Sequence, residues 1–194
     1  MARIKEAWGP ISLCAALGLV MAGHALADGV VISSGALAGA CYEAAKSGTP
    51  SEDGIHLCTR ALAEDALDAK DRAGTLINRS VLLIRAKSYR QALSDLEVAQ
   101  RLAPGLGEGD VNRGAALLGL HRWNEAVAAL NLGLQERASE PEKAYFNRAT
   151  AREQLDDLTG AYLDYRKAAE IAPHWDAPRQ ELTRFHVESG QTPG

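Results

Sequence analysis

Three segments of this chain begin with the same short pattern, an asparagine and an arginine followed by a small residue. The asparagines are Asn78, Asn112 and Asn147, spaced by 34 and 35 residues, and an alanine follows each of them 14 residues later. A fixed period of this length is typical of stacked helix-turn-helix units. Because one such unit cannot bury its own apolar face, we expect an all-α fold in which the units stack into a right-handed α-solenoid.

The period divides the chain into three helix-turn-helix repeats, over residues 73–106, 107–140 and 142–175, and Pro141 is the extra residue that lengthens the second spacing. The two helices of a repeat can approach closely only where their side chains are small. We therefore expect a bulky replacement at these crossings to overpack them, at a cost of about 1–3 kcal/mol. The expected crossings are Ala92 with Ser80, Ala126 with Gly114, and Ala161 with Ala149.

The first 27 residues have the pattern of a secretory signal peptide. Arg3 and Lys5 precede an uncharged apolar run over residues 11–22, and Ala25-Leu26-Ala27 matches a small-x-small cleavage site. We expect cleavage after Ala27, a flexible lead over residues 28–35, and a periplasmic or secreted protein with no membrane span. The alternative is an uncleaved membrane anchor, for which the apolar run is at the short limit.

Two cysteines, Cys41 and Cys58, follow the expected cleavage site. They lie in residues 36–72, whose pattern predicts a degenerate pair of antiparallel helices ahead of the repeats. An even number of cysteines in an exported protein favours a disulfide, which would join the two helices. A lipid-modified Cys41 is the weaker alternative, and the spacing is not that of a Cys-x-x-Cys redox pair.

Composition and motifs exclude several classes of function. The net charge of −4 provides no clustered basic surface for nucleic acid, and the five histidines are scattered singly, without the spacing of a metal site. No phosphate-binding loop or catalytic constellation is present. We expect no enzymatic activity, no cofactor and no metal. Residues 176–189 are expected to form a helix that caps the last repeat.

These repeats resemble the tetratricopeptide repeat family through their length, their alanines and the aromatic residues Tyr89 and Trp123 in the turns. The Asn-Arg-Gly opening, together with Asp95 and Asp164 in the second helices, resembles bacterial members, and with the leader this indicates an exported one. The resemblance implies binding of a partner peptide or helix in a concave groove lined by the first helix of each repeat. Ile77, Val111 and Phe146 stand where relatives that bind C-terminal carboxylates carry lysines, so that mode of binding is not expected. The implied groove residues are Ile77, Asn78, Val81, Ile84, Arg85, Val111, Asn112, Ala115, Leu118, Phe146, Asn147 and Thr150.

The repeated asparagines have two interpretations: they bind the backbone of a ligand, or they tie neighbouring repeats together. The spacing also predicts that Arg79 pairs with Asp95 and Arg148 with Asp164 across their hairpins. The leading hypothesis for function is a non-enzymatic scaffold or adaptor that binds a protein or peptide. The alternative is a structural protein that self-associates through the ends of its repeat stack.

Overall fold

The helices of this protein follow one another as antiparallel hairpins. The computed structural model describes residues 3–6, 25–27, 29–32 and 34–188 of the 194-residue chain. In chain order its elements are β1 (Arg3–Glu6), α1 (Ala36–Lys46), α2 (Glu52–Glu64), α3 (Ala69–Arg85), α4 (Tyr89–Leu102), α5 (Gly107–Gly119), α6 (Trp123–Gln135), α7 (Pro141–Glu153), α8 (Leu158–Ile171), α9 (Asp176–Leu182) and β2 (Phe185–Glu188).

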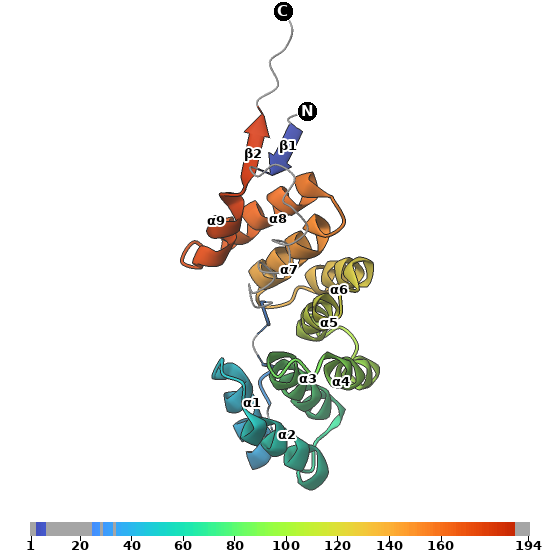
Figure 1. Ribbon diagram of the computed structural model, residues 1–194. Helices are drawn as coiled ribbons and strands as arrows, with labels where there is room; N and C mark the ends of the chain where they lie inside the picture. Colours follow the sequence, from blue (N-terminus) through green and yellow to red (C-terminus); the bar gives the residue numbers. More distant parts are fainter. Residues whose placement is uncertain (1–2, 7–24, 28, 33, 189–194) are drawn as a thin grey trace, which may run out of the picture.

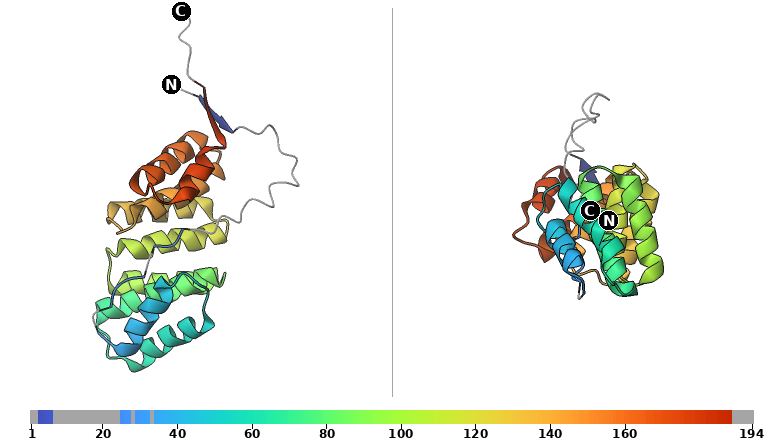
Figure 2. Two further views of the ribbon diagram at one scale, coloured as in Figure 1. Left: turned by 90° about the vertical axis from the view of Figure 1, so that its left-hand side faces the viewer. Right: turned by 90° about the horizontal axis from the view of Figure 1, so that it is seen from below.

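The hairpins stack in one direction into a helical repeat solenoid. Within each hairpin α1 packs on α2, α3 on α4, α5 on α6 and α7 on α8, and between hairpins α2 packs on α3, α4 on α5 and α6 on α7. Figure 1 shows the stack from α1 and α2 at one end to α9 at the other, and Figure 2 shows its layers from the side. The expectation of an all-α solenoid of helix-turn-helix repeats is confirmed.

The three alanines expected at the helix crossings are buried, and Gly114 faces Leu130. Ala92, Ala126 and Ala161 are fully buried. At Gly114 on α5, an added Cβ would lie 2.5 Å from Cγ of Leu130 on α6. This distance is far inside van der Waals contact, so the absence of a side chain at Gly114 allows α5 and α6 to approach each other.

The boundary between the first helix pair and the repeats differs from the expected one. Helix α3 begins at Ala69, inside the stretch 36–72 assigned to the first pair, because the Asp68 carboxylate caps it by accepting a hydrogen bond from the Asp71 N–H at 2.8 Å. Helix α2 ends at Glu64, and the following Asp65 carboxylate accepts a hydrogen bond from the Ala38 N–H at 2.9 Å. This bond ties the end of α2 to the start of α1.

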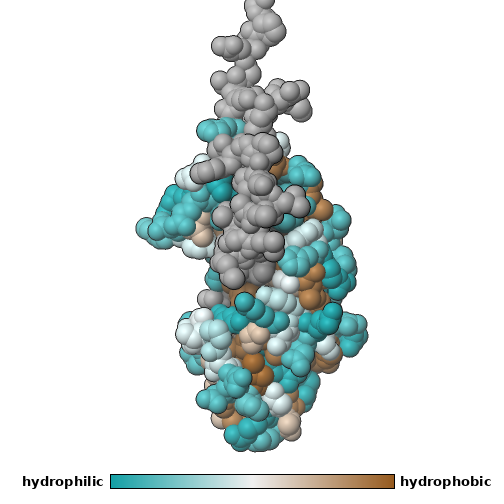
Figure 3. All heavy atoms as spheres, viewed as in Figure 1, coloured by the Kyte–Doolittle hydropathy of each residue, from teal (hydrophilic) through white to brown (hydrophobic). Residues whose placement is uncertain are grey.

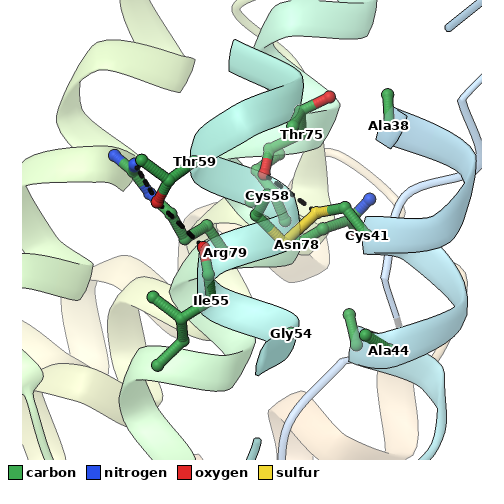
Figure 4. The surroundings of a disulfide bond; sticks show 12 residues. Ala38, Cys41, Ala44, Gly54, Ile55, Cys58, Thr59, Thr75, Asn78 and Arg79 are labelled. Atoms are coloured by element: carbon green, nitrogen blue, oxygen red, sulfur yellow. Dashed lines mark hydrogen bonds between the residues drawn. A yellow bond between two sulfur atoms is a disulfide. The ribbon is translucent and has the colours of Figure 1, made fainter. Parts of the chain in front are cut away.

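A disulfide joins Cys41 on α1 to Cys58 on α2, across a sequence separation of 17 residues, as expected (Figure 4). Both cysteines are fully buried, beside Val81 and Leu82 of α3. The disulfide therefore links the first helix pair at the point where that pair packs on the first repeat.

The chain after α8 differs from the expected capping helix over residues 176–189. Helix α9 ends at Leu182, and β2 pairs antiparallel with β1. The Phe185 ring is buried against Tyr162 and Tyr165, at centroid distances of 5.9 and 6.0 Å, while Arg184 binds the Glu153 carboxylate of α7 at 2.6 Å. We attribute the early end of the helix to these contacts, which hold the chain against α7 and α8.

The predicted arginine–aspartate pairs are confirmed. They are Arg79–Asp95 and Arg148–Asp164, each closed by two hydrogen bonds of 2.7–2.8 Å. In each case the arginine also donates to the second helix of the preceding hairpin, to Thr59 at 3.1 Å or to Asn131 at 2.6 Å. These arginines therefore connect successive hairpins on the side of the second helices.

The surface in the view of Figure 3 is largely hydrophilic over the described residues, and apolar residues show as small separate spots. None of the described helices has the length and apolar character needed to span a bilayer. The apolar run 11–22 of the expected signal peptide lies outside the described residues.

Candidate functional site

Three equivalent asparagines form a row along one face of the solenoid. Asn78 lies on α3, Asn112 on α5 and Asn147 on α7, and each side chain is 0% exposed. We call this side of α3, α5 and α7 the groove face. An extended stretch of the same chain, residues 25–27 and 29–32, lies along it, and we call this stretch the groove segment. Figure 2 shows it crossing the stacked helices.

The asparagines bind the backbone of the groove segment. Asn78 accepts a hydrogen bond from the Val30 N–H at 2.6 Å and donates one to the Val30 carbonyl at 2.9 Å. Asn147 makes the same pair of bonds with Ala25, accepting from its N–H at 3.0 Å and donating to its carbonyl. An amide that binds N–H and C=O of one residue imitates a neighbouring β-strand. The segment thus runs from the third repeat toward the first.

The middle asparagine is only half satisfied. Asn112 accepts a hydrogen bond from the Ala27 N–H at 3.1 Å, but its buried Nδ2 has no hydrogen-bond partner within the part of the chain that the structure describes. A buried amide donor without a partner costs about 1–3 kcal/mol. The groove segment therefore fits the middle repeat less well than it fits the other two.

This imperfect fit has a geometric cause. In an extended chain, residues two apart present their backbone groups to the same side, so Ala25 and Ala27 can both face the row of asparagines. Val30 is three residues beyond Ala27, so it does not fall into this alternation. Gly29 lies there, and an added Cβ would come within 2.5 Å of the Asn78 side-chain oxygen. The contact of Val30 with Asn78 is thus out of step with the other two and lies beside Gly29.

The side chains of the groove segment enter the apolar core of the repeats. Ala27 is 0% exposed and packs in the cluster of Val111 and Leu118, while Ala25 packs in the cluster of Phe146. Leu26, the residue between them in the sequence, packs against one cluster formed by α1, α2 and α3 and against another formed by α3, α4 and α5. The groove face therefore accepts small side chains at two positions and a branched apolar side chain at the position between them.

The first repeat holds the later part of the segment through close packing. An added Cβ at Gly74 would lie 2.7 Å from Cδ1 of Ile32 and 3.0 Å from Cγ1 of Val30. The Ser34 hydroxyl donates a hydrogen bond to the buried Asp71 carboxylate. The expectation of a flexible lead over residues 28–35 is therefore wrong for its described part, because backbone bonds and apolar contacts hold that part on α3.

The other expected groove residues have different positions. Seven apolar ones are buried within the clusters that join the helices, so they support the groove face from below: Ile77, Val81, Ile84, Val111, Ala115, Leu118 and Phe146. Arg85 donates to the Ala45 carbonyl of α1, and Thr150 contacts the Tyr165 hydroxyl at 3.2 Å. Of the expected set, the asparagines are the residues that the structure shows bonded to an extended backbone.

Sequence reasoning missed Gly74 and the groove segment itself. The Ala-Leu-Ala sequence that predicts a cleavage site also supplies the two alanines and the leucine packed against the repeats. The small side chains of this sequence fit two interpretations, a cleavage site and a segment that packs in a groove. The sequence alone favours the cleavage site.

Two carboxylates on the helices of this face have raised pKa values. Burial raises the pKa of Asp110 on α5 to about 7, although Arg113, 2.6 Å away, opposes the rise. Burial also raises the pKa of Glu153 on α7, against the effect of Arg184. The described residues hold no group of three or more histidine, cysteine or carboxylate side chains able to bind a metal ion.

Comparison with known proteins supports the same architecture. No family model matches the chain. The chain is 39% identical over 72 residues to the peptidyl-prolyl cis-trans isomerase FKBP42 of Arabidopsis thaliana, a match that covers 37% of this chain and 20% of that protein. The shared part is thus a fifth of the relative's length.

Solved structures resemble the chain over more of its length. The TPR domain of Arabidopsis OM64 matches with a TM-score of 0.57 and 22% identity, covering 60% of this chain and 95% of that one. MamA from Desulfovibrio magneticus matches with a TM-score of 0.59 and 18% identity, covering 77% and 84%. The first TPR of Spaghetti (RPAP3), bound to the HSP90 peptide SRMEEVD, matches with a TM-score of 0.55 and 24% identity, covering 59% and 90%. At these identities the likeness shows the fold, that of tetratricopeptide repeat domains.

Proposed function

We propose that this protein is a non-enzymatic interaction module that binds an extended segment of a partner protein along the groove face. The observation that carries the proposal is the set of hydrogen bonds that join a peptide backbone to Asn78, Asn112 and Asn147. Backbone bonds provide affinity for an extended peptide of many sequences, while the adjoining side-chain positions provide selectivity.

The comparisons support a role of this kind. One solved structure with the same fold holds a peptide, and stacked repeats of this kind present extended binding surfaces. Because the residue before each asparagine here is apolar (Ile77, Val111 and Phe146), the groove face lacks lysines at these positions. We therefore propose an uncharged internal segment of the partner as the ligand, instead of a C-terminal carboxylate. The extended form of the groove segment favours a strand-like ligand over a helical one.

We also propose that the protein acts in the periplasm or outside the cell. The amino-terminal sequence pattern supports export, and the Cys41–Cys58 disulfide is consistent with an oxidising compartment. In that setting the partner is another exported protein or the exported part of a membrane protein.

A peptide array tests the proposal. The protein is recovered from the periplasm of an exporting bacterium and applied to short peptides that tile candidate exported proteins. We expect selected peptides to bind the wild type and the Asn131→Ala variant, and to lose binding to the Asn112→Ala/Asn147→Ala double variant. Asn131 is an exposed α6 residue that bonds Arg148, away from the groove segment, which makes it a matched control. Binding that survives in the double variant would refute the proposed site.

A further inference from the structure

We infer that residues 25–27 block the groove face in the uncleaved chain, and that cleavage after Ala27 opens it to a partner segment of small–branched apolar–small sequence. The inference rests on the proposed function and adds its regulation and the chemistry of its ligand. It follows from the position of the expected cleavage site inside the groove segment.

The expected scissile bond divides the contacts of the groove segment into two sets. Ala25 and Ala27, on its amino-terminal side, bind Asn147 and Asn112. Val30, on its carboxyl-terminal side, binds Asn78 and packs on Gly74. Hydrolysis adds water across the Ala27 peptide bond, leaving a carboxylate on Ala27 and an amine on the next residue. Because Ala27 is 0% exposed in the docked segment, the bond is cut while residues 25–27 are detached from the groove face. The released peptide then no longer returns to α5 and α7 through a tether, while Val30 keeps its contacts with α3.

The vacated positions define the chemistry of the next ligand. Ala27 is enclosed by apolar side chains of α5 and Ala25 lies beside Phe146, so longer side chains would clash at these two positions. Leu26, which packs on the clusters of α1 to α3 and of α3 to α5, shows that a branched apolar residue fits at the position between them in the sequence. A partner segment therefore needs two small residues separated by one branched apolar residue, with its amino-terminal end toward α7.

The unpaired Nδ2 of Asn112 indicates why a partner segment can replace the chain's own. The groove segment reaches Asn78 out of step with Ala25 and Ala27, and among the residues that the structure describes this buried donor has no hydrogen-bond partner. A separate peptide does not have to continue onto α3. It can therefore adopt the register in which one of its carbonyls accepts a hydrogen bond from Asn112 Nδ2. The intramolecular segment compensates for its poorer fit through its tether, which gives an effective concentration on the order of 1 mM.

Displacing the segment without cleavage tests the block. The uncleaved chain is produced without export, in a disulfide-forming cytosol, as wild type, as the Ala25→Asp/Ala27→Asp variant and as the Val31→Asp variant. Val31 is 72% exposed within the same segment, so its variant controls for the added charge. The probe is a labelled, C-terminally amidated peptide with the sequence of residues 21–27, measured by fluorescence anisotropy. Circular dichroism establishes that each chain is folded.

We expect the double variant to bind the probe at least about tenfold more tightly than either the wild type or the Val31→Asp variant, because an intramolecular competitor lowers the apparent affinity. Equal binding by all three chains would refute the block and leave the proposed function standing. A folded double variant that fails to bind this probe would refute the ligand chemistry. The failure of every peptide on the array would refute the proposed function itself.

A separate experiment tests whether the chain is cleaved after Ala27. The chain is expressed with its own leader in an exporting bacterium, and mass spectrometry determines its amino terminus. We expect a chain that begins at residue 28 and binds the probe as tightly as the Ala25→Asp/Ala27→Asp variant. An exported protein that still carries Ala25 and Ala27 would overturn cleavage as the opening step.

Discussion

Replacing Asn147 by alanine tests whether the asparagine row holds the groove segment. The substitution removes the acceptor for the Ala25 N–H, 3.0 Å away, and the donor to the Ala25 carbonyl. Both groups of Ala25 are buried on α7 in the wild type, so they lose their partners unless the segment moves into solvent. The perturbation acts on the segment, while the packing of α7 on α8 stays in place.

The magnitude follows from the number of bonds. A neutral hydrogen bond contributes about 0.5–1.5 kcal/mol net, so two bonds correspond to about 2 kcal/mol of docking free energy. At 1.4 kcal/mol for each factor of ten, the population with residues 25–27 detached should rise about 30-fold. The midpoint of thermal unfolding should change little, because the helices keep their own contacts.

Amide hydrogen exchange of the full-length chain measures this effect. We expect a peptide covering residues 25–27 to exchange about 30-fold faster in the Asn147→Ala variant, and at the wild-type rate in the Asn131→Ala variant. Two outcomes would show that the asparagine bonds do not hold the segment. One is that residues 25–27 of the wild type exchange as fast as an unstructured peptide, and the other is that exchange is not accelerated in the Asn147→Ala variant.

Three other predictions concern the scaffold. Gly114→Ala should lower the free energy of unfolding by about 1 kcal/mol through overpacking at α6, whereas Gly39→Ala, whose added Cβ meets nothing within 4 Å, should raise it by about 1 kcal/mol, as urea titration would show. Replacing Cys41 and Cys58 by alanine should destabilise the α1–α2 hairpin by about 3 kcal/mol, because the disulfide closes a loop with a sequence separation of 17 residues. Faster amide hydrogen exchange in those two helices would show this. The pKa of Asp110 is raised from 3.8 to about 7, so its stabilising contribution is complete below about pH 4 and is lost as the pH rises to about 7. Urea midpoints of Asp110→Asn should fall less over that interval than those of the wild type, and parallel profiles would contradict this assignment.

Periodicity determined the architecture of this protein. The spacing of Asn78, Asn112 and Asn147 predicts the stacked hairpins, because a repeat that cannot bury its own apolar face must pack on a copy of itself. The burial of Ala92 follows from the same pattern, and the disulfide follows from an even pair of cysteines on two neighbouring helices. Such features can be predicted because each depends on residues close together in the chain or related by the period.

Only the tertiary structure decided what covers the asparagines. Ala25 and Asn147 are 122 residues apart, and no periodic pattern connects them. The same holds for the end of α9, where contacts of Phe185 with α8 replace the expected helix. Whether a polar side chain in the row meets another repeat, water or an extended backbone depends on which distant segment reaches it. That outcome is set by three-dimensional packing, which the one-dimensional pattern does not contain.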